Sequence, residues 1–233
     1  MIKRLNLAIL TIVIFSAALI GLNGCSDSTV TATQGDNVTF GYSSTPDTVD
    51  HIGILVLDTV KILLKDIKLN VASTSDSTNF KTGPFVLNLN LNSPAVVNGI
   101  GSAHIPPGTY DKVQFEVHKL NSNETVPDPE FNDGSNTYSV IAKGSYNGIR
   151  FVFKSDKSAK QKLNFPNALV VTTTSTNITL RISPYIWFID QNTSLYLDPN
   201  DPNNHNAIDD NIKDNIKANF KAFKDDDKNG IPD

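Results

Sequence analysis

Apolar and polar residues alternate along much of the middle of this chain, which is the pattern of half-buried β-strands. In residues 85–91 and 113–117 the apolar side chains occupy the odd positions, and in residues 178–182 they occupy the even positions. Apart from Val86, polar or charged residues fill the positions between them. One face of each strand should therefore pack into a core while the other meets solvent. Weaker strands are expected near 37–42, 52–57, 138–144, 149–154 and 160–165.

Residues 60–71 fit a helix almost as well as a strand. The last apolar residues of this segment alternate cleanly, and the segments on either side are strands. We therefore predict a strand with a β-bulge near Lys65 and Asp66, where one extra residue restores the alternation.

Two short turn signals separate the predicted strands. Pro107-Gly108 suits the centre of a type II turn, where Gly takes a positive φ. Asn147-Gly148 lies between two apolar runs and predicts a tight β-hairpin. Frequent strands joined by such turns predict a mainly β fold, an antiparallel β-sandwich over residues 37–197, rather than βαβ units.

The pattern changes after a loop rich in Pro, Asn and Asp at 198–206. Apolar residues then recur at helical spacing, and acids precede bases along the segment, which complements the helix dipole. We predict one C-terminal amphipathic helix that ends near Lys224 and covers an edge or end of the sandwich. The alternative is a helix that binds a partner. The apolar stripe comprises Ile208, Ile212, Ile216, Phe220 and Phe223.

The first residues have the order of a secretory signal peptide, since Lys3 and Arg4 precede an apolar run at 5–22. That run ends in Leu-Asn-Gly-Cys, and this ending resembles the lipobox of bacterial lipoproteins. The resemblance implies that residues 1–24 are a cleaved signal peptide and that the sulfur of Cys25 carries a lipid. The mature protein would then be held on a membrane through this lipid.

Residues 25–36 are polar and would form a tether between the lipid and the sandwich. Ser26 follows Cys25, and in bacteria with the usual sorting rule this favours the outer membrane over the inner membrane. Two alternatives remain open: an uncleaved apolar anchor, for which the run is short, and a free thiol at Cys25. Because Cys25 is the only Cys, no intramolecular disulfide can form.

The charge balance bears on the choice of partner. The 233 residues include 20 Lys or Arg and 24 Asp or Glu, a net charge of −4. Loss of Lys3 and Arg4 with the signal peptide would lower this by two, to −6. Nucleic-acid binding requires a basic face, so we do not expect a nucleic-acid partner.

The acidic tail at 225–233 contains the best candidate metal site. Asp225, Asp227, Asn229 and Asp233 fall at positions 1, 3, 5 and 9 of a calcium loop, with Gly230 at position 6, where the sharp turn needs it. The run resembles the acidic repeats of thrombospondin type 3 and the loops of dockerins. It departs from them because it occurs once and because position 12 lies beyond the last residue. The alternative is a solvated acidic tail.

Other candidate chemistry is sparse. The four His residues have no zinc-ligand spacing, and His118 is expected on the solvated face of its strand. The sequence has no common catalytic motif, and only three Glu residues could contribute to a glycosidase pair. Tyr185 and Trp187, next to Phe188, could form a platform for a sugar, but an aromatic cluster directly after a strand is more typical of core packing.

Residues 105–117 read Ile-Pro-Pro-Gly-Thr-Tyr-Asp-Lys-Val-Gln-Phe-Glu-Val. This stretch resembles a bacterial lipoprotein domain of unknown function, in which a Pro-x-Gly-x-Tyr turn precedes an alternating strand. The resemblance spans about residues 37–190 and implies an immunoglobulin-like or transthyretin-like sandwich in the cell envelope. It implies no reaction and no catalytic residue.

The sequence thus predicts a non-enzymatic, lipid-anchored envelope protein with a binding or structural role, and calcium as the one candidate cofactor. Its partner would be a protein or a glycan. A carbohydrate-binding lipoprotein of a polysaccharide-uptake system is the first alternative, which exposed aromatic residues would favour. A hydrolase is the second, which converging carboxylates in a pocket would favour.

Overall fold

A computed structural model describes residues 32–46, 54–121, 123–214 and 220–233. The predicted signal peptide, Cys25 and most of the predicted tether lie outside the described residues. Within this part of the chain, no helix is both long and apolar enough to cross a membrane.

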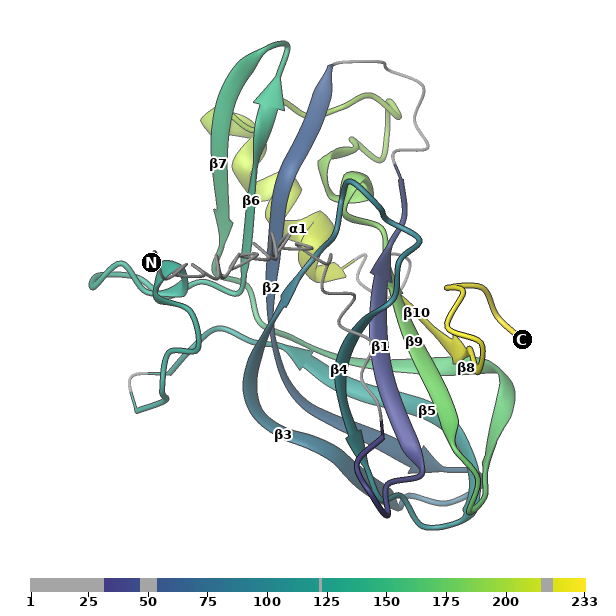
Figure 1. The fold of residues 1–233 in the computed structure, drawn as a ribbon. Coiled ribbons are helices and arrows are strands. Elements are labelled where there is room, and N and C mark those ends of the chain that lie inside the picture. Colours follow the sequence, from purple (N-terminus) through teal and green to yellow (C-terminus); the bar gives the residue numbers. More distant parts are fainter. Residues whose placement is uncertain (1–31, 47–53, 122, 215–219) are drawn as a thin grey trace, which may run out of the picture.

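The described chain forms two β-sheets, and the prediction of a mainly β sandwich is confirmed (Figure 1). Sheet A has the order β10-β9-β1-β4, and sheet B has the order β7-β6-β2-β5-β8 with β3 also paired to β2. All pairs are antiparallel except β1 with β9, which are parallel. The strands of sheet A are β1 (Val38–Ser44), β4 (Asn98–Ala103), β9 (Thr176–Ile182) and β10 (Phe220–Lys224). Those of sheet B are β2 (Leu55–Val71), β3 (Ser77–Asn88), β5 (Gly108–Val117), β6 (Val140–Tyr146), β7 (Ile149–Ser155) and β8 (Ala159–Val171).

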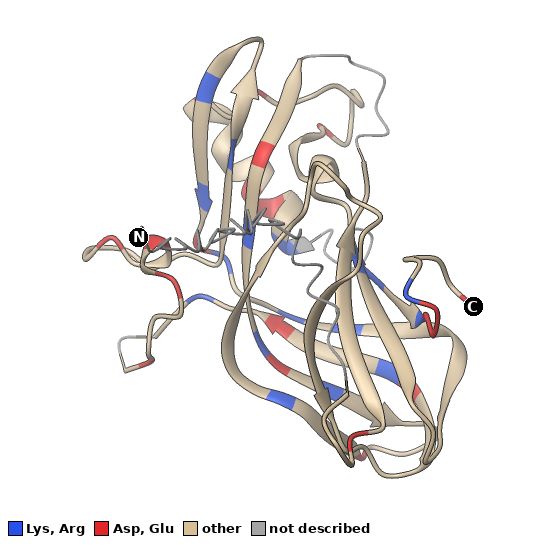
Figure 2. Cartoon of the chain, in the orientation of Figure 1, with Lys and Arg blue, Asp and Glu red and all other residues tan. Residues whose placement is uncertain are grey.

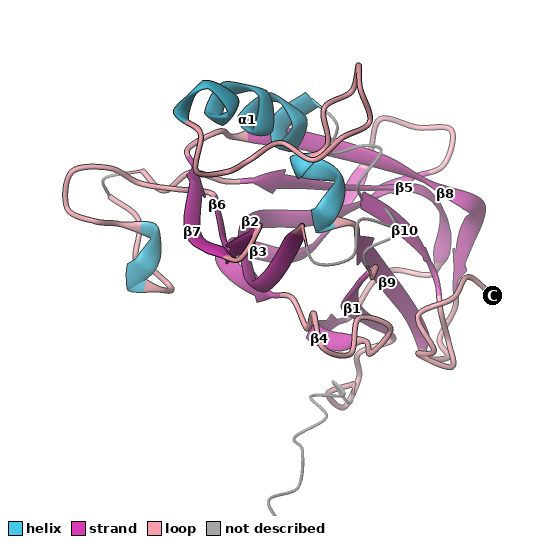
Figure 3. Cartoon of the chain, turned by 90° about the horizontal axis from the view of Figure 1, so that it is seen from above, coloured by secondary structure: helices cyan, strands magenta, loops and turns pink. Residues whose placement is uncertain are grey.

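The described residues also form four short helical elements: the 3-10 helices η1 (Pro129–Phe131), η2 (Pro184–Phe188) and η3 (Pro202–Asn204), and the α-helix α1 (His205–Asp214). Seen from above, α1 lies at the margin of the strands (Figure 3). Its Ile208 and Ile212 are buried in the same core as the inward faces of both sheets. A helix of this length gains most of its stability from such packing.

The predicted register of the strands is confirmed. Val113 and Val117 are 0% and 1% exposed, whereas Gln114 between them is only half-buried. Leu87 and Leu89 are buried in this core, and their odd-numbered neighbours pack against it. Each fully buried aliphatic side chain contributes about 1.5–3 kcal/mol relative to an exposed one.

The predicted β-bulge in β2 is also confirmed. The pairing of β2 with β3 shifts between Lys65 and Ile67, and Asp66 adopts a positive φ of 55°. The Asp66 carboxylate accepts a hydrogen bond from the backbone N–H of Gly83 (2.9 Å), which stabilises this conformation. β2 thereby pairs with β6 along its first half and with β5 along its second half (Figure 1).

One turn prediction is confirmed and the other is wrong. Asn147 and Gly148 both have positive φ, at 48° and 78°, as a type I′ hairpin between β6 and β7 requires. Gly108 is not among the described residues with positive φ, because it already pairs with Val171 as the first residue of β5. The turn before it is closed instead by the Tyr110 hydroxyl, which donates to the Pro106 carbonyl (2.8 Å).

The C-terminal helix is shorter than predicted. Its predicted member Ile216 lies outside the described residues, and Phe220 and Phe223 belong to β10. This strand extends sheet A by pairing antiparallel with β9. Phe220 and Ala222 face the core and Lys221 between them is exposed, as in a strand, although Phe223 is buried as well. The free edge of β9 provides the ladder.

A candidate metal centre in the C-terminal loop

The acidic loop at 225–233 folds back onto the outer face of sheet A instead of ending in solvent beside a helix (Figure 1). The backbone N–H of Asp225 donates to the carbonyl of Asn177 in β9 (2.9 Å). The backbone N–H and the side-chain amide of Asn177 in turn donate to the carboxylate and the carbonyl of Asp226 (2.9 and 3.0 Å). The start of the loop is therefore bonded to β9 and is not a free extension beyond β10.

A tight turn at Gly230 allows this packing. Gly230 has a positive φ of 75°, which suits a residue without a side chain. A Cβ at this position would lie 2.8 Å from the carbonyl oxygen of Ala95, so the loop also approaches the backbone that precedes β4 closely. Position 6 of the predicted calcium loop is thus constrained both by its backbone conformation and by its neighbour.

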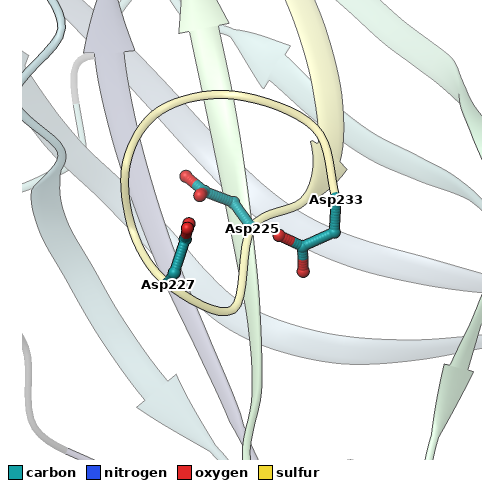
Figure 4. Close-up of side chains that lie close together, drawn as sticks. All are labelled: Asp225, Asp227 and Asp233. Carbon is teal, nitrogen blue, oxygen red and sulfur yellow. The ribbon is translucent and has the colours of Figure 1, made fainter.

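The loop brings three of the four predicted ligands together. Asp225, Asp227 and Asp233 each offer one carboxylate oxygen, and these oxygens all lie within 4.8 Å of one another (Figure 4). Oxygens bind Ca²⁺ at 2.3–2.6 Å, so two ligands on opposite sides of one ion lie about 5 Å apart. The spacing of the three carboxylates is therefore compatible with a single shared ion.

Asp225 is the decisive residue of the group because its side chain is buried. Its Oδ2 accepts hydrogen bonds from the Thr179 hydroxyl (2.6 Å) and the Gly230 backbone N–H (3.1 Å). Its Oδ1 is buried without a hydrogen-bond partner in the described part of the chain. Burial raises the pKa of Asp225, the Asp227 carboxylate raises it further, and the bonds from Thr179 and Gly230 only partly offset these effects. A buried carboxylate oxygen of this kind is costly unless a proton or a cation neutralises it.

The other loop carboxylates have partners within the loop. Asp227 accepts from the backbone N–H and the side-chain amide of Asn229 (3.2 and 2.7 Å). The side-chain oxygen of Asn229, the fourth predicted ligand, accepts from the backbone N–H of Ile231 (2.7 Å). These bonds hold the loop in a compact turn around the carboxylates, which lowers the cost of arranging them for a metal.

Asp233 is held by a cation of the chain itself. It accepts from the backbone N–H of Asp226 (2.9 Å) and from the ammonium of Lys224 (3.0 Å), and these two interactions lower its pKa. Lys224 also pairs with Asp226. An ion that binds in the loop therefore competes with Lys224 for Asp233, while Asp225 has no such competitor.

The structure contains a second polar cluster, around His118, that the sequence did not predict. His118, expected in solvent, has a side chain that is 5% exposed, and its two ring nitrogens contact Glu116 (3.0 Å) and Glu124 (2.5 Å). Glu124 also accepts from Lys65 (2.5 Å), so it connects the segment after β5 to β2. His118 points outward as predicted, but the excursion between β5 and β6 covers it. No local pattern signals such a cover.

The predicted aromatic platform is part of the core. Trp187 is 1% exposed and Phe188 is fully buried, while Tyr185 is half-buried and packs against the core. Phe188 contacts the rings of Phe151 and Phe153 at 5.9 Å between centroids. The indole face that would stack on a sugar is therefore covered by protein.

The comparisons with known proteins add no assignment. No protein-family model, curated protein or solved structure matches this chain.

Proposed function

We propose that this chain is a non-catalytic, lipid-anchored protein of the bacterial cell envelope whose β-sandwich is clamped by a Ca²⁺ ion in the loop at 225–233. Two observations carry the calcium proposal: Oδ1 of Asp225 is buried without a hydrogen-bond partner in the described chain, and the Asp225 carboxylate lies close to two further carboxylates. The hard oxygens of these three side chains are ligands that Ca²⁺ prefers. The site is expected to bind with a Kd of about 10⁻⁴ to 10⁻³ M, as in extracellular modules.

The role of the ion would be structural. The loop already contacts β9 through Asn177 and Thr179, and the ion would add a charge-neutralised link between Asp225 and the end of the loop. At about 10 mM free Ca²⁺ such a site stabilises the folded state by about 1–3 kcal/mol. Where calcium is abundant, the ion would thus hold the loop against the outer face of sheet A.

Thermal unfolding of the full-length protein in detergent micelles tests the clamp. Calcium should raise the melting temperature of the wild type relative to EDTA, and Asp225→Asn should abolish this difference. Asp76→Asn serves as the matched control, because Asp76 is exposed and lies outside the loop. Equal melting temperatures of the wild type in calcium and in EDTA would contradict the calcium site and would mean that the loop is only an acidic tail.

The lipid anchor rests on the sequence before the sandwich, where Cys25 follows the apolar run and a polar segment leads to β1. Cys25→Ser should release the protein from membrane fractions into the soluble fraction of the envelope. A variant that remains in the membrane with its first segment uncleaved would contradict lipidation and favour an apolar anchor.

A further inference from the structure

A groove lies along the seam where the free edges of the two sheets meet. β8 is the last strand of sheet B and β10 is the last strand of sheet A, and the two strands contact each other. The cavity between them has a volume of about 570 Å³, and its lining includes Phe220 and Phe223. We call it the basic groove, because its lining includes Lys112, Lys162, Arg181 and Lys221 and no acidic side chain.

An irregularity in β8 creates the groove. Lys112 pairs with Asn164 and Tyr110 pairs with Leu169, so residues 165–168 of β8 lie opposite a single residue of β5. Pro166 within this segment has no backbone N–H and cannot add to the ladder. The segment therefore bulges from the sheet, and Pro166 forms one wall of the basic groove.

The cations of the basic groove are poorly neutralised. Lys162 and Lys221 are exposed and have no ion pair within the described ranges. The guanidinium of Arg181 lies over the ring of Phe223, 4.9 Å from its centroid, which fixes its orientation. Lys112 pairs with the adjacent Asp111 (2.5 Å). Figure 2 shows the basic positions on β5, β8 and β10 at this side of the molecule.

This arrangement is unexpected in a chain with a net charge of −4. Like charges that converge on one cavity repel one another, and an anionic ligand would relieve that repulsion. The free edges of β8 and β10 add backbone groups that can donate to or accept from a polar ligand. The basic groove therefore suits a ligand with several anionic groups and many hydroxyls.

The shape of the groove narrows the class of ligand. Beyond Pro166 and Pro232 it continues into a second cavity of about 300 Å³, bordered by Lys224 and Asp233, so the surface is elongated. The rings of Phe220 and Phe223 are 1% and 2% exposed, so they cannot stack on bases as single-stranded nucleic acid requires. The cations also line a recess, whereas a membrane surface calls for cations that project from a flat face.

We propose that the basic groove binds an anionic polysaccharide, with the carboxylate or sulfate groups of the sugar paired with Lys162, Arg181 and Lys221. The basic groove itself contains none of the carboxylates of the metal loop, and of the three only Asp233 borders its extension. Failure of this proposal therefore leaves the calcium proposal intact, and the two are tested by different variants.

Isothermal titration of the full-length protein in detergent micelles tests the proposal, with calcium present at saturation throughout. The probes are polygalacturonate oligosaccharides for carboxylates, heparin oligosaccharides for sulfates, and an uncharged galactan. At least one anionic probe should bind and the galactan should not. Lys162→Gln and Lys221→Gln should each weaken binding about 3- to 5-fold, and the double variant at least about tenfold, as the loss of partly exposed charge pairs predicts.

The matched control removes two charges elsewhere. Lys81→Gln with Lys154→Gln lowers the net charge equally but alters β3 and β7, which do not line the basic groove. This control should bind like the wild type. Equal affinity of the two double variants would overturn the groove as the site. Binding of neither anionic probe, or tighter binding of single-stranded DNA or of anionic phospholipid vesicles, would overturn the polysaccharide as its ligand.

Discussion

Glu124 should contribute a measurable share of the stability of this protein, and that share should vanish in acid. Its two carboxylate oxygens contact Lys65 of β2 and His118 at the end of β5, both at 2.5 Å. It also accepts from the backbone N–H of Asn121 (2.9 Å). One side chain thus fastens the start of the excursion between β5 and β6 to the outer face of sheet B.

The size of this contribution to stability follows from the pKa of Glu124. Burial alone would raise the pKa of Glu124, but the hydrogen bonds from Asn121, Lys65 and His118 outweigh it and lower the value from 4.5 to about 2. At about 1.4 kcal/mol per pH unit, this difference corresponds to about 3 kcal/mol. The side chain is 17% exposed, so solvent screening reduces the expected contribution to about 2 kcal/mol.

The sign of the pH dependence is fixed by the direction of the pKa change. Because the folded state lowers the pKa of Glu124, its contribution is fully present above 4.5 and is lost as the pH falls toward about 2. Glu124→Gln keeps the shape of the side chain but removes the charge. The variant should be about 2 kcal/mol less stable than the wild type at neutral pH, and the two should converge in acid.

Urea unfolding of both proteins over this pH range measures the difference directly. Only the difference between the two curves matters, since other carboxylates such as Asp128 and Asp156 also have lowered pKa values. Asp76→Asn again provides the control and should follow the wild type at every pH. A gap between wild type and Glu124→Gln that stays constant from neutral to acid pH would refute the electrostatic role of Glu124.

Three further substitutions test the core, the pairing of β2 with β6 and the metal loop. Val117→Asp would bury an unpaired charge and should cost about 4 kcal/mol or more, enough for near-ultraviolet circular dichroism to report loss of the fold. Gly144→Ala would place a Cβ 1.9 Å from the Val56 carbonyl oxygen and should cost about 2 kcal/mol in urea unfolding, whereas Gly108→Ala, with no atom within 3.4 Å and no positive φ, should be nearly neutral. In EDTA at neutral pH, Asp225→Asn should be at least as stable as the wild type, because a raised carboxylate pKa destabilises the folded state above that pKa. As the pH falls, the stability of the wild type should increase relative to that of the variant. A large loss of stability for Asp225→Asn in EDTA would contradict this.

The features that sequence predicted correctly are those encoded by neighbouring residues. The alternation in residues 113–117 sets which side chains face the core, because successive side chains of a strand point to opposite faces. The break in alternation near Asp66 located a bulge, and Asn147-Gly148 identified a hairpin turn. A few neighbouring residues are enough to determine each of these features physically.

The incorrect predictions share a different cause. His118 was assigned to solvent from its position after Val117, but the excursion that begins just after it, including Glu124, covers its side chain. Gly108 was assigned to a turn from the Pro before it, but pairing with Val171 holds it extended. In both cases a contact with residues outside the strand, near in sequence for His118 and far for Gly108, overrides the local preference.

The acidic loop has one feature that neighbouring residues encode and one that a tertiary contact sets, and β10 explains why. The ligand spacing from Asp225 to Asp233 is local and can be recognised in the sequence, but the burial of Asp225 is not. In a helix that continued to Lys224, the next residues would extend into solvent beyond its end. As a strand, β10 places Lys224 opposite Ile178, which brings Asp225 onto Asn177 and within reach of the Thr179 hydroxyl. The same pairing places Lys221 opposite Arg181 at the basic groove. Both proposed sites therefore depend on one strand pairing, and a substitution that prevents β10 from joining β9 should disable them together.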